Sequence, residues 1–228
     1  MRHNAVAALV GLVLVAIGAG IARGQRSAQD GHGLLASARW GGEQVEVARY
    51  AARAAVGSES YTLTIATHGR GPALRSAIEV AGPDRRVQTV IDVARGDARR
   101  LLRASRSEHT LLGHVTKELG LPPGALLLEQ VPLVLRSAGP KAGETLALRV
   151  GELDLVVKHA GAKEQRTPAG AATCDEYVLL HEGEGGKQDV IGVYLIGQGA
   201  ERRVLALVTP ELSARLVDYG WEPVEEQR

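Results

Sequence analysis

The chain has 228 residues, a formal net charge of +1, one cysteine and no phenylalanine. This length suits one domain of ordinary size with appendages. A nearly neutral charge with intermixed signs argues against a nucleic-acid binder, which needs a positive field to displace counterions from phosphates. A single cysteine excludes an internal disulfide and any zinc site built on paired thiolates.

The N-terminal segment is apolar and directs the chain to a membrane. Residues 5–22 carry no charge and as a helix would measure about 27 Å, close to the thickness of a bilayer core. Arg2 precedes this run, and Gly20 to Ala22 offers the small residues that a signal peptidase reads. Arg23 and Arg26 make the downstream flank the more positive one, so the orientation stays open.

We therefore expect residues 1–22 to be a signal peptide or a transmembrane anchor. Both readings place the chain in the cell envelope, either anchored in the inner membrane facing the periplasm or periplasmic or secreted after cleavage. Residues 23–39 include a polar, glycine-bearing stretch typical of a linker. The folded domain is expected over residues 40–221, with a polar tail at 222–228 and with His3 and His32 outside the domain.

From about residue 43 the chain shows short runs of alternating apolar and polar residues, which predict half-buried strands. Gly82 to Asp84 and Gly151-Glu152 predict hairpin turns between two pairs of these runs. The run at 190–196 is apolar on both faces and predicts a central, covered strand. The predicted strands are Tyr61–Ile65, Arg75–Val80, Val87–Val93, Leu146–Val150, Leu153–Val157, Tyr177–Leu180, Val190–Ile196 and Val204–Thr209.

The middle of the chain supplies the expected cover for this sheet. Leu111, Leu112, Val115 and Leu119 form an apolar stripe at helical spacing behind Ser107 as N-cap. A second apolar run, 126–135, is interrupted by Pro132. The predicted fold is mainly β: a curved antiparallel sheet (half-barrel) with one or two covering helices, preceded by an N-terminal apolar helix.

No residue pattern points to catalysis, a cofactor or a metal. His109 and His114 would lie about 140° apart on the predicted helix, the wrong offset for two ligands. His68, His159 and His181 lie beside predicted turns, as solvated loop residues would. We expect a protein that is not an enzyme, although a hydrolase using His109, His114 or His181 stays open.

Two further features have a structural explanation. Arg95, Arg99, Arg103 and Arg106 would share one face of a helix and could meet lipid phosphates, whereas on a strand they would split between faces. The surrounding β pattern favours the strand and a solvated surface. Cys174 is expected to be a small, half-buried hydrophobe, with a free thiol for intermolecular pairing as the alternative.

The C-terminal half carries a resemblance to a known family. Thr167-Pro168-Ala169-Gly170 leads into the strand of Tyr177, and Val193–Ile196, Ala200–Leu205 and Leu216–Gly220 follow. Over residues 61–220 this order resembles a family of bacterial envelope proteins of unknown function, similar in shape to LolA- and LolB-like lipoprotein carriers. The resemblance implies a half-barrel sheet that holds an acyl chain under a helical lid, and it implies no catalytic residue.

Two non-enzymatic hypotheses follow. In the first, the exported domain binds a lipid or another apolar ligand between the sheet and its cover, driven by apolar burial. In the second, the domain has a solid core without a ligand and serves as a structural or interaction part of an envelope assembly. The residues expected to line the ligand site are Leu63, Ile65, Leu111, Val115, Leu119 and Leu155.

Overall fold

The computed structural model describes residues 28–37, 44–54, 59–70, 73–94, 101–183, 186–200, 202–210 and 212–223. The apolar run 5–22, the arginines 95 and 99, and the tail beyond Pro223 lie outside the described residues. Within the described ranges, every helix is too short or too polar to cross a bilayer.

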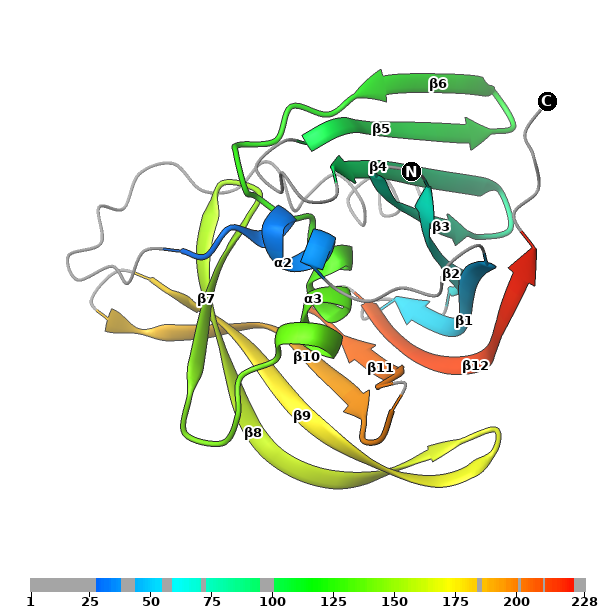
Figure 1. The fold of residues 1–228 in the computed structure, drawn as a ribbon. Helices are drawn as coiled ribbons and strands as arrows, with labels where there is room; N and C mark the ends of the chain where they lie inside the picture. Colours follow the sequence, from blue (N-terminus) through cyan, green and yellow to red (C-terminus); the bar gives the residue numbers. More distant parts are fainter. Residues whose placement is uncertain are drawn as a thin grey trace.

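The described chain forms one antiparallel sheet of twelve strands, which confirms the predicted mainly β fold. The strands lie in the order β6-β5-β4-β3-β2-β1-β12-β11-β10-β9-β8-β7, so β6 and β7 are the two edges. Figure 1 shows the sheet curving around the helices α2 and α3. The bounds are β1 Gln44–Ala54, β2 Ser60–Arg70, β3 Ala73–Ala81, β4 Arg85–Ala94, β5 Leu101–Thr110, β6 Gly113–Glu118, β7 Thr145–Val150, β8 Leu153–Thr167, β9 Gly170–Glu182, β10 Gln188–Gly197, β11 Val204–Val208 and β12 Leu212–Pro223.

The sheet consists of two meanders of six strands that meet where the first strand pairs with the last. Strands β1 to β6 pair in chain order, and so do β7 to β12. The β1–β12 ladder joins them, running from Gln44 opposite Pro223 to Ala54 opposite Leu212. The register shifts once, between Arg49 opposite Asp218 and Tyr50 opposite Leu216, so Val217 is an extra residue on β12.

The alternating runs form strands as predicted. In β2 the side chains of Tyr61, Leu63 and Ile65 are buried on one face, as their spacing indicates. Gly82 joins β3 to β4, and Gly151, with φ of +57°, opens the two-residue turn between β7 and β8. β10 lies between β9 and β11, and Tyr194, Leu195 and Ile196 are all buried, as expected for a covered strand. The start of the predicted run is not covered, because Val190 is 52% exposed.

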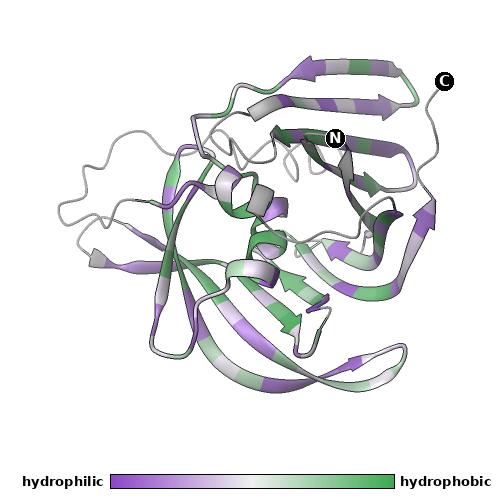
Figure 2. Cartoon of the chain, in the orientation of Figure 1, coloured by the Kyte–Doolittle hydropathy of each residue, from purple (hydrophilic) through white to green (hydrophobic). Residues whose placement is uncertain are grey.

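In the described part of the chain, three short helices pack against the sheet and complete the core: α2 (Gly31–Ser37), the 3₁₀ helix η2 (Leu128–Gln130) and α3 (Val131–Ala138). Val131, Leu133, Val134 and Leu135 of α3 are buried in the main core cluster. Pro132 lies in the first turn of α3, where the absent N–H has no helical partner to lose, so it begins the helix rather than interrupting it. Figure 2 shows hydrophobic segments on these helices and on the strands around them.

The helix predicted behind Ser107 is wrong. Ser107 lies in β5, and Leu111-Leu112 forms the two-residue turn to β6, with Gly113 at φ of +145°. Leu111 and Leu112 are 85% and 99% exposed. The leucine spacing is compatible with both a helix and a hairpin turn. The chain forms the hairpin because β5 pairs with β4 on one side and with β6 on the other.

The linker predicted over 23–39 is wrong for residues 28–37, the part that the structure describes, because these residues belong to the folded domain. Leu35 and His32 on α2 are almost completely buried. Gln29 bridges to Leu148 of β7, and Gly31 N–H donates to the carbonyl of Gly124 at 3.0 Å. The folded domain therefore begins at or before residue 28 rather than at residue 40, and His32 belongs to its core.

Candidate functional site

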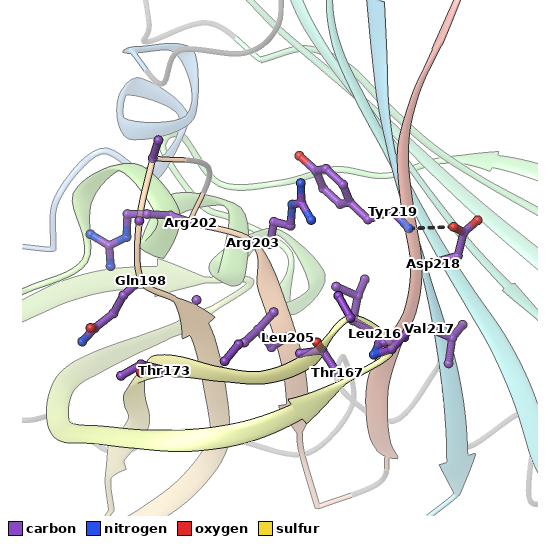
Figure 3. A pocket seen from close by; sticks show the side chains of 16 residues that line it. Thr167, Thr173, Gln198, Arg202, Arg203, Leu205, Leu216, Val217, Asp218 and Tyr219 are labelled. Atoms are coloured by element: carbon purple, nitrogen blue, oxygen red, sulfur yellow. Dashed lines mark hydrogen bonds between the residues drawn. The ribbon is translucent and has the colours of Figure 1, made fainter.

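A pocket of about 930 Å³ lies at the end of the sheet where β10 passes to β11. Figure 3 shows its side chains between the β8–β9 hairpin, the β10–β11 connection and β12. The lining is mixed, with apolar side chains from three elements and two neighbouring arginines. The lining residues are Thr167, Pro168, Ala169, Ala172, Thr173, Gly197, Gln198, Gly199, Ala200, Arg202, Arg203, Leu205, Leu216, Val217, Asp218 and Tyr219.

One wall is the tip of the long β8–β9 hairpin. The last β9–β10 pair is Cys174 opposite Gly197, so residues 170–173 extend beyond this ladder and pair with β8. Thr173 is also held from the other side, because its carbonyl accepts a hydrogen bond from Gln198 N–H at 3.0 Å. Thr167 Oγ1 donates to the carbonyl of Gly170 at 2.9 Å, and Gly170 has φ of +116°. A positive φ favours glycine, so Gly170 allows the tight turn that shapes this wall.

The opposite wall is the β10–β11 connection, which Asp175 holds in place. Gln198 Nε2 donates to Asp175 Oδ1 at 2.8 Å, and Arg202 Nη2 lies 3.4 Å from Asp175 Oδ2. Arg202 also donates to Tyr177 Oη at 2.7 Å. Arg202 is the one non-glycine residue with a positive φ (+41°) in the part of the chain that the structure describes. These bonds stabilise a backbone conformation that ordinary residues seldom adopt.

The floor of the pocket comes from β11 and β12. Leu205 and Leu216 are buried there, and the guanidinium of Arg203 lies 4.0 Å from the ring centroid of Tyr219. A guanidinium at this distance is attracted to the electron-rich face of the ring. Trp221 packs edge-on against Tyr219, with ring centroids 6.3 Å apart. Because Val217 is an extra residue, the strand turns Leu216 and Tyr219 to the same face of the sheet.

Charged side chains of both signs lie at the pocket, with Arg202, Arg203 and Asp218 in its lining. Of the two carboxylates nearby, Asp218 accepts a hydrogen bond from Arg49 at 2.8 Å, and Asp175 is bonded to Gln198 and Arg202 and lies 3.4 Å from His159 Nε2. Both carboxylates are therefore engaged with cations or amides. Arg202 is itself one of these cations, and Arg203, stacked on Tyr219, is the second basic side chain that lines the space. Chemically, this arrangement can bind an apolar body that ends in an acidic or strongly polar group.

The six residues predicted to line a ligand site do not surround one space. Leu63, Ile65 and Leu155 lie in the main core cluster, packed with the helices. Leu119 is half-buried beside a smaller cluster formed by Ile91, Val93, Ala104 and Leu127. Leu111 is exposed, and so is Val115 at 67%. The cause is the replacement of the predicted helix by the β5–β6 hairpin, which carries Leu111 and Val115 away from the core.

The histidines also differ from expectation. His109 and His114 face each other across β5 and β6 with ring centroids 4.1 Å apart. His68, His159 and His181 lie within strands and are partly buried, not in solvated loops, because the strands extend further than the apolar runs that predicted them. Within the described ranges, no three side chains of His, Cys, Asp or Glu are grouped so that they could hold a metal.

Two predictions are confirmed in part: Arg103 and Arg106 lie on a strand, but Arg106 is buried rather than part of a solvated surface, and Cys174 is fully rather than half buried. Arg103 and Arg106 lie on β5, with the first exposed and the second buried and donating to Thr89 Oγ1 at 3.2 Å, so they occupy opposite faces of a strand. Cys174 is a free, fully buried cysteine. Burial raises the pKa of its thiol, which favours the unreactive neutral form.

The sequence interpretation missed the arginine pocket. Its turn residues were visible as glycines around Gln198, but the pairing of Arg203 with Tyr219 depends on the extra residue in β12. A bulge would show in the sequence as a break in the alternation of apolar and polar residues. Residues 218–222 have no clear alternation, so the bulge could not be seen there.

The chain matches no protein-family model and no curated protein sequence. Among the solved structures to which it is similar are the following two. One is a β-barrel-like protein of the domain of unknown function DUF1849 from Brucella abortus, with 10% identity and a TM-score of 0.39, covering 79% of this chain and 98% of the other. The second is a DUF1329 family protein from Desulfovibrio piger, with 9% identity and a TM-score of 0.30, covering 87% and 93%.

Proposed function

We propose that this chain is a non-enzymatic binding domain whose ligand is an apolar molecule with an acidic end group, of the fatty-acid or acyl-lipid class. The observation that carries the proposal is the pocket in which buried Leu205 and Leu216 lie beside Arg202 and Arg203. An acyl chain would cover the leucines, and its acidic end would meet the arginines. Each buried methylene contributes about 0.8 kcal/mol, so a short acyl segment is enough for binding.

The size of the pocket supports this ligand class. Sites for small molecules enclose roughly 300–1,000 Å³ and combine apolar walls with a few polar groups, and this pocket falls within that range. The resemblance to LolA- and LolB-like carriers suggests the same class of ligand. The proposed site differs from theirs in position, because the space beneath α3 is occupied by the side chains of the main core cluster.

The location in the cell envelope is part of the proposal. Residues 5–22 would bring the domain to a membrane, where acylated ligands are abundant. Extraction of the full chain from membranes with alkaline carbonate tests this point. A chain that stays in the membrane pellet is anchored, a soluble chain that begins near residue 23 has been cleaved, and a cytosolic chain with Met1 intact contradicts the proposal.

The binding experiment uses the full chain, purified from a bacterial envelope without harsh detergent. Native mass spectrometry with lipid extraction is expected to find an acidic amphiphile at near-unit stoichiometry. Direct titration then compares palmitate with hexadecanol, which has the same chain without the carboxylate. Palmitate is expected to bind more tightly, and Arg203→Gln is expected to reduce that preference.

A matched pair of valines makes the test specific to the pocket. Val217 lines the pocket and is 46% exposed, whereas Val208 is 44% exposed and does not line it. Val217→Trp is expected to weaken palmitate binding by about tenfold or more, which is about 1.4 kcal/mol. Val208→Trp is expected to leave it unchanged. A bare mass together with no palmitate binding would refute the proposal and favour a structural or interaction domain with a solid core.

A further inference from the structure

Strand β6 presents an open edge of the sheet. It follows β5 through a two-residue turn, so Gly113, Val115 and Lys117 exchange backbone hydrogen bonds with β5. The backbone N–H and C=O groups of His114, Thr116 and Glu118 then point away from β5. No other strand pairs with that side of β6 in the part of the chain that the structure describes, as Figure 1 also shows.

Side-chain contacts agree with this assignment of hydrogen bonds. The rings of His109 and His114 stack at 4.1 Å, and Ser107 Oγ lies 2.9 Å from Thr116 Oγ1. Such close side-chain pairs are typical of the non-hydrogen-bonded positions of an antiparallel ladder. The groups of His114 and Thr116 that β5 does not use are therefore available at the edge.

The edge also carries unusual apolar exposure. All six residues of β6 are exposed, and the turn before it holds Leu111 and Leu112, whose side chains lie almost wholly outside the fold. An open strand beside exposed leucines is a template for pairing with another strand.

We propose that β6 pairs antiparallel with β6 of a second copy of this chain, with Thr116 opposite Thr116 on the two-fold axis. Only His114, Thr116 and Glu118 of β6 present outward backbone groups, so each hydrogen-bonded pair across the axis must join two of these residues. The numbers of two opposed residues therefore add to an even sum, and neighbouring registers differ in that sum by two. With Thr116 on the axis, His114 faces Glu118, and an imidazole N–H can donate to the carboxylate. The aliphatic stem of Lys117 covers Val115 on the other face.

The neighbouring registers are worse. A shift in one direction places Lys117 opposite Lys117, and like charges directly opposite each other are destabilising. A shift in the other direction places Leu112 opposite Glu118. The register centred on Thr116 avoids both and pairs a donor with an acceptor twice, once on each side of the axis.

This register also provides cover for the exposed turn. Leu111 and Leu112 of one copy fall beside Leu121 and Gly120 of the other, where Leu119 and Leu121 pack on the smaller core cluster. The interface is isologous, as a two-fold axis requires, and joins two sheets into one through a β5–β6–β6–β5 seam. The inference rests on the sheet edge and is independent of the proposed ligand.

Cysteine cross-linking of the full chain tests the register. Opposed hydrogen-bonded residues have Cα atoms about 5.5 Å apart, within the range that a disulfide spans. Thr116→Cys is expected to form a covalent dimer under mild oxidation. Val115→Cys and Lys117→Cys are expected to cross-link poorly alone but well when the two variants are mixed. The wild type is the control, because its one cysteine, Cys174, is fully buried.

Light scattering after size exclusion measures the association itself. The wild type is expected to be a dimer, and Thr116→Pro a monomer with an unchanged circular dichroism spectrum, because that N–H points outward and serves no bond to β5. If the proline variant unfolds, Thr116→Glu replaces it, since two carboxylates would then face each other on the axis. A wild type that is monomeric at its highest soluble concentration, or equal cross-linking of all three single cysteines, overturns the proposal.

Discussion

Replacing Arg136 by methionine is expected to destabilise the domain by about 3–5 kcal/mol, because it leaves a buried carboxylate without its partner. Arg136 on α3 donates two hydrogen bonds to Glu46 on β1, the second at 3.1 Å. The side chains are only 12% and 5% exposed. Burial raises the pKa of nearby Tyr50 above its ordinary value, with Arg136 lowering it and Glu46 raising it, which places all three groups in one poorly solvated space.

The assay is urea denaturation followed by circular dichroism, with thermal melting beside it. For a domain of this size 1 kcal/mol shifts Tm by about 2–4 °C, so the variant is expected to melt about 6–20 °C lower. The double variant Glu46→Leu with Arg136→Met is expected to recover most of the loss, because no buried charge remains. Arg49→Met is the control, since its partners Asp218 and Glu222 are exposed and the loss should stay below about 1 kcal/mol.

Two outcomes would refute this reasoning. A loss below about 1 kcal/mol for Arg136→Met would mean that water solvates Glu46. A double variant no more stable than the single one would mean that Arg136 acts through its packing rather than through its charge.

Two further predictions concern α2, the helix in the segment that the sequence indicated as a linker. Leu35→Ala is expected to lower the free energy of unfolding, measured by urea denaturation, by about 2–5 kcal/mol, because Leu35 is buried in the main core. The control Leu112→Ala, at the exposed turn, should change it by no more than about 0.5 kcal/mol. Equal losses in the two variants would contradict the packing of α2. Burial lowers the pKa of His32 in the folded chain below its ordinary value of about 6.5. At a pH between the folded and unfolded pKa values, the imidazole is protonated in the unfolded chain but neutral in the folded one. The free energy of unfolding therefore falls as the pH drops below about 6.5. His32→Gln is expected to flatten this fall in the free energy of unfolding between pH 7 and 5, and an identical slope in both proteins would show that His32 is solvated.

The strands were predictable because each alternating run agrees with the pleat of a half-buried sheet. The β5–β6 hairpin was not, because Leu111, Leu112, Val115 and Leu119 satisfy a helical period as well as a turn with two polar strands. Local sequence could not choose between them, since the β4–β5 ladder that decides it is a tertiary feature.

The missed parts of the site have a similar cause. α2 is seven residues long and contains two glycines, so its sequence resembles a linker until Leu35 meets the core. The pocket depends on a bulge in β12 and on how far the β8–β9 hairpin extends beyond β10, and both are properties of register rather than of composition.

The pairing of β1 with β12 has a consequence for biosynthesis. Each meander consists of neighbours in the chain and can form as soon as its own strands have left the ribosome. The ladder between Gln44 and Pro223 instead joins the first and last strands of the sheet, so β1 waits with one open edge until β12 has been made. Completion of the sheet is therefore tied to the synthesis of β12, and a product that stops before Leu212 keeps that edge exposed and prone to aggregation.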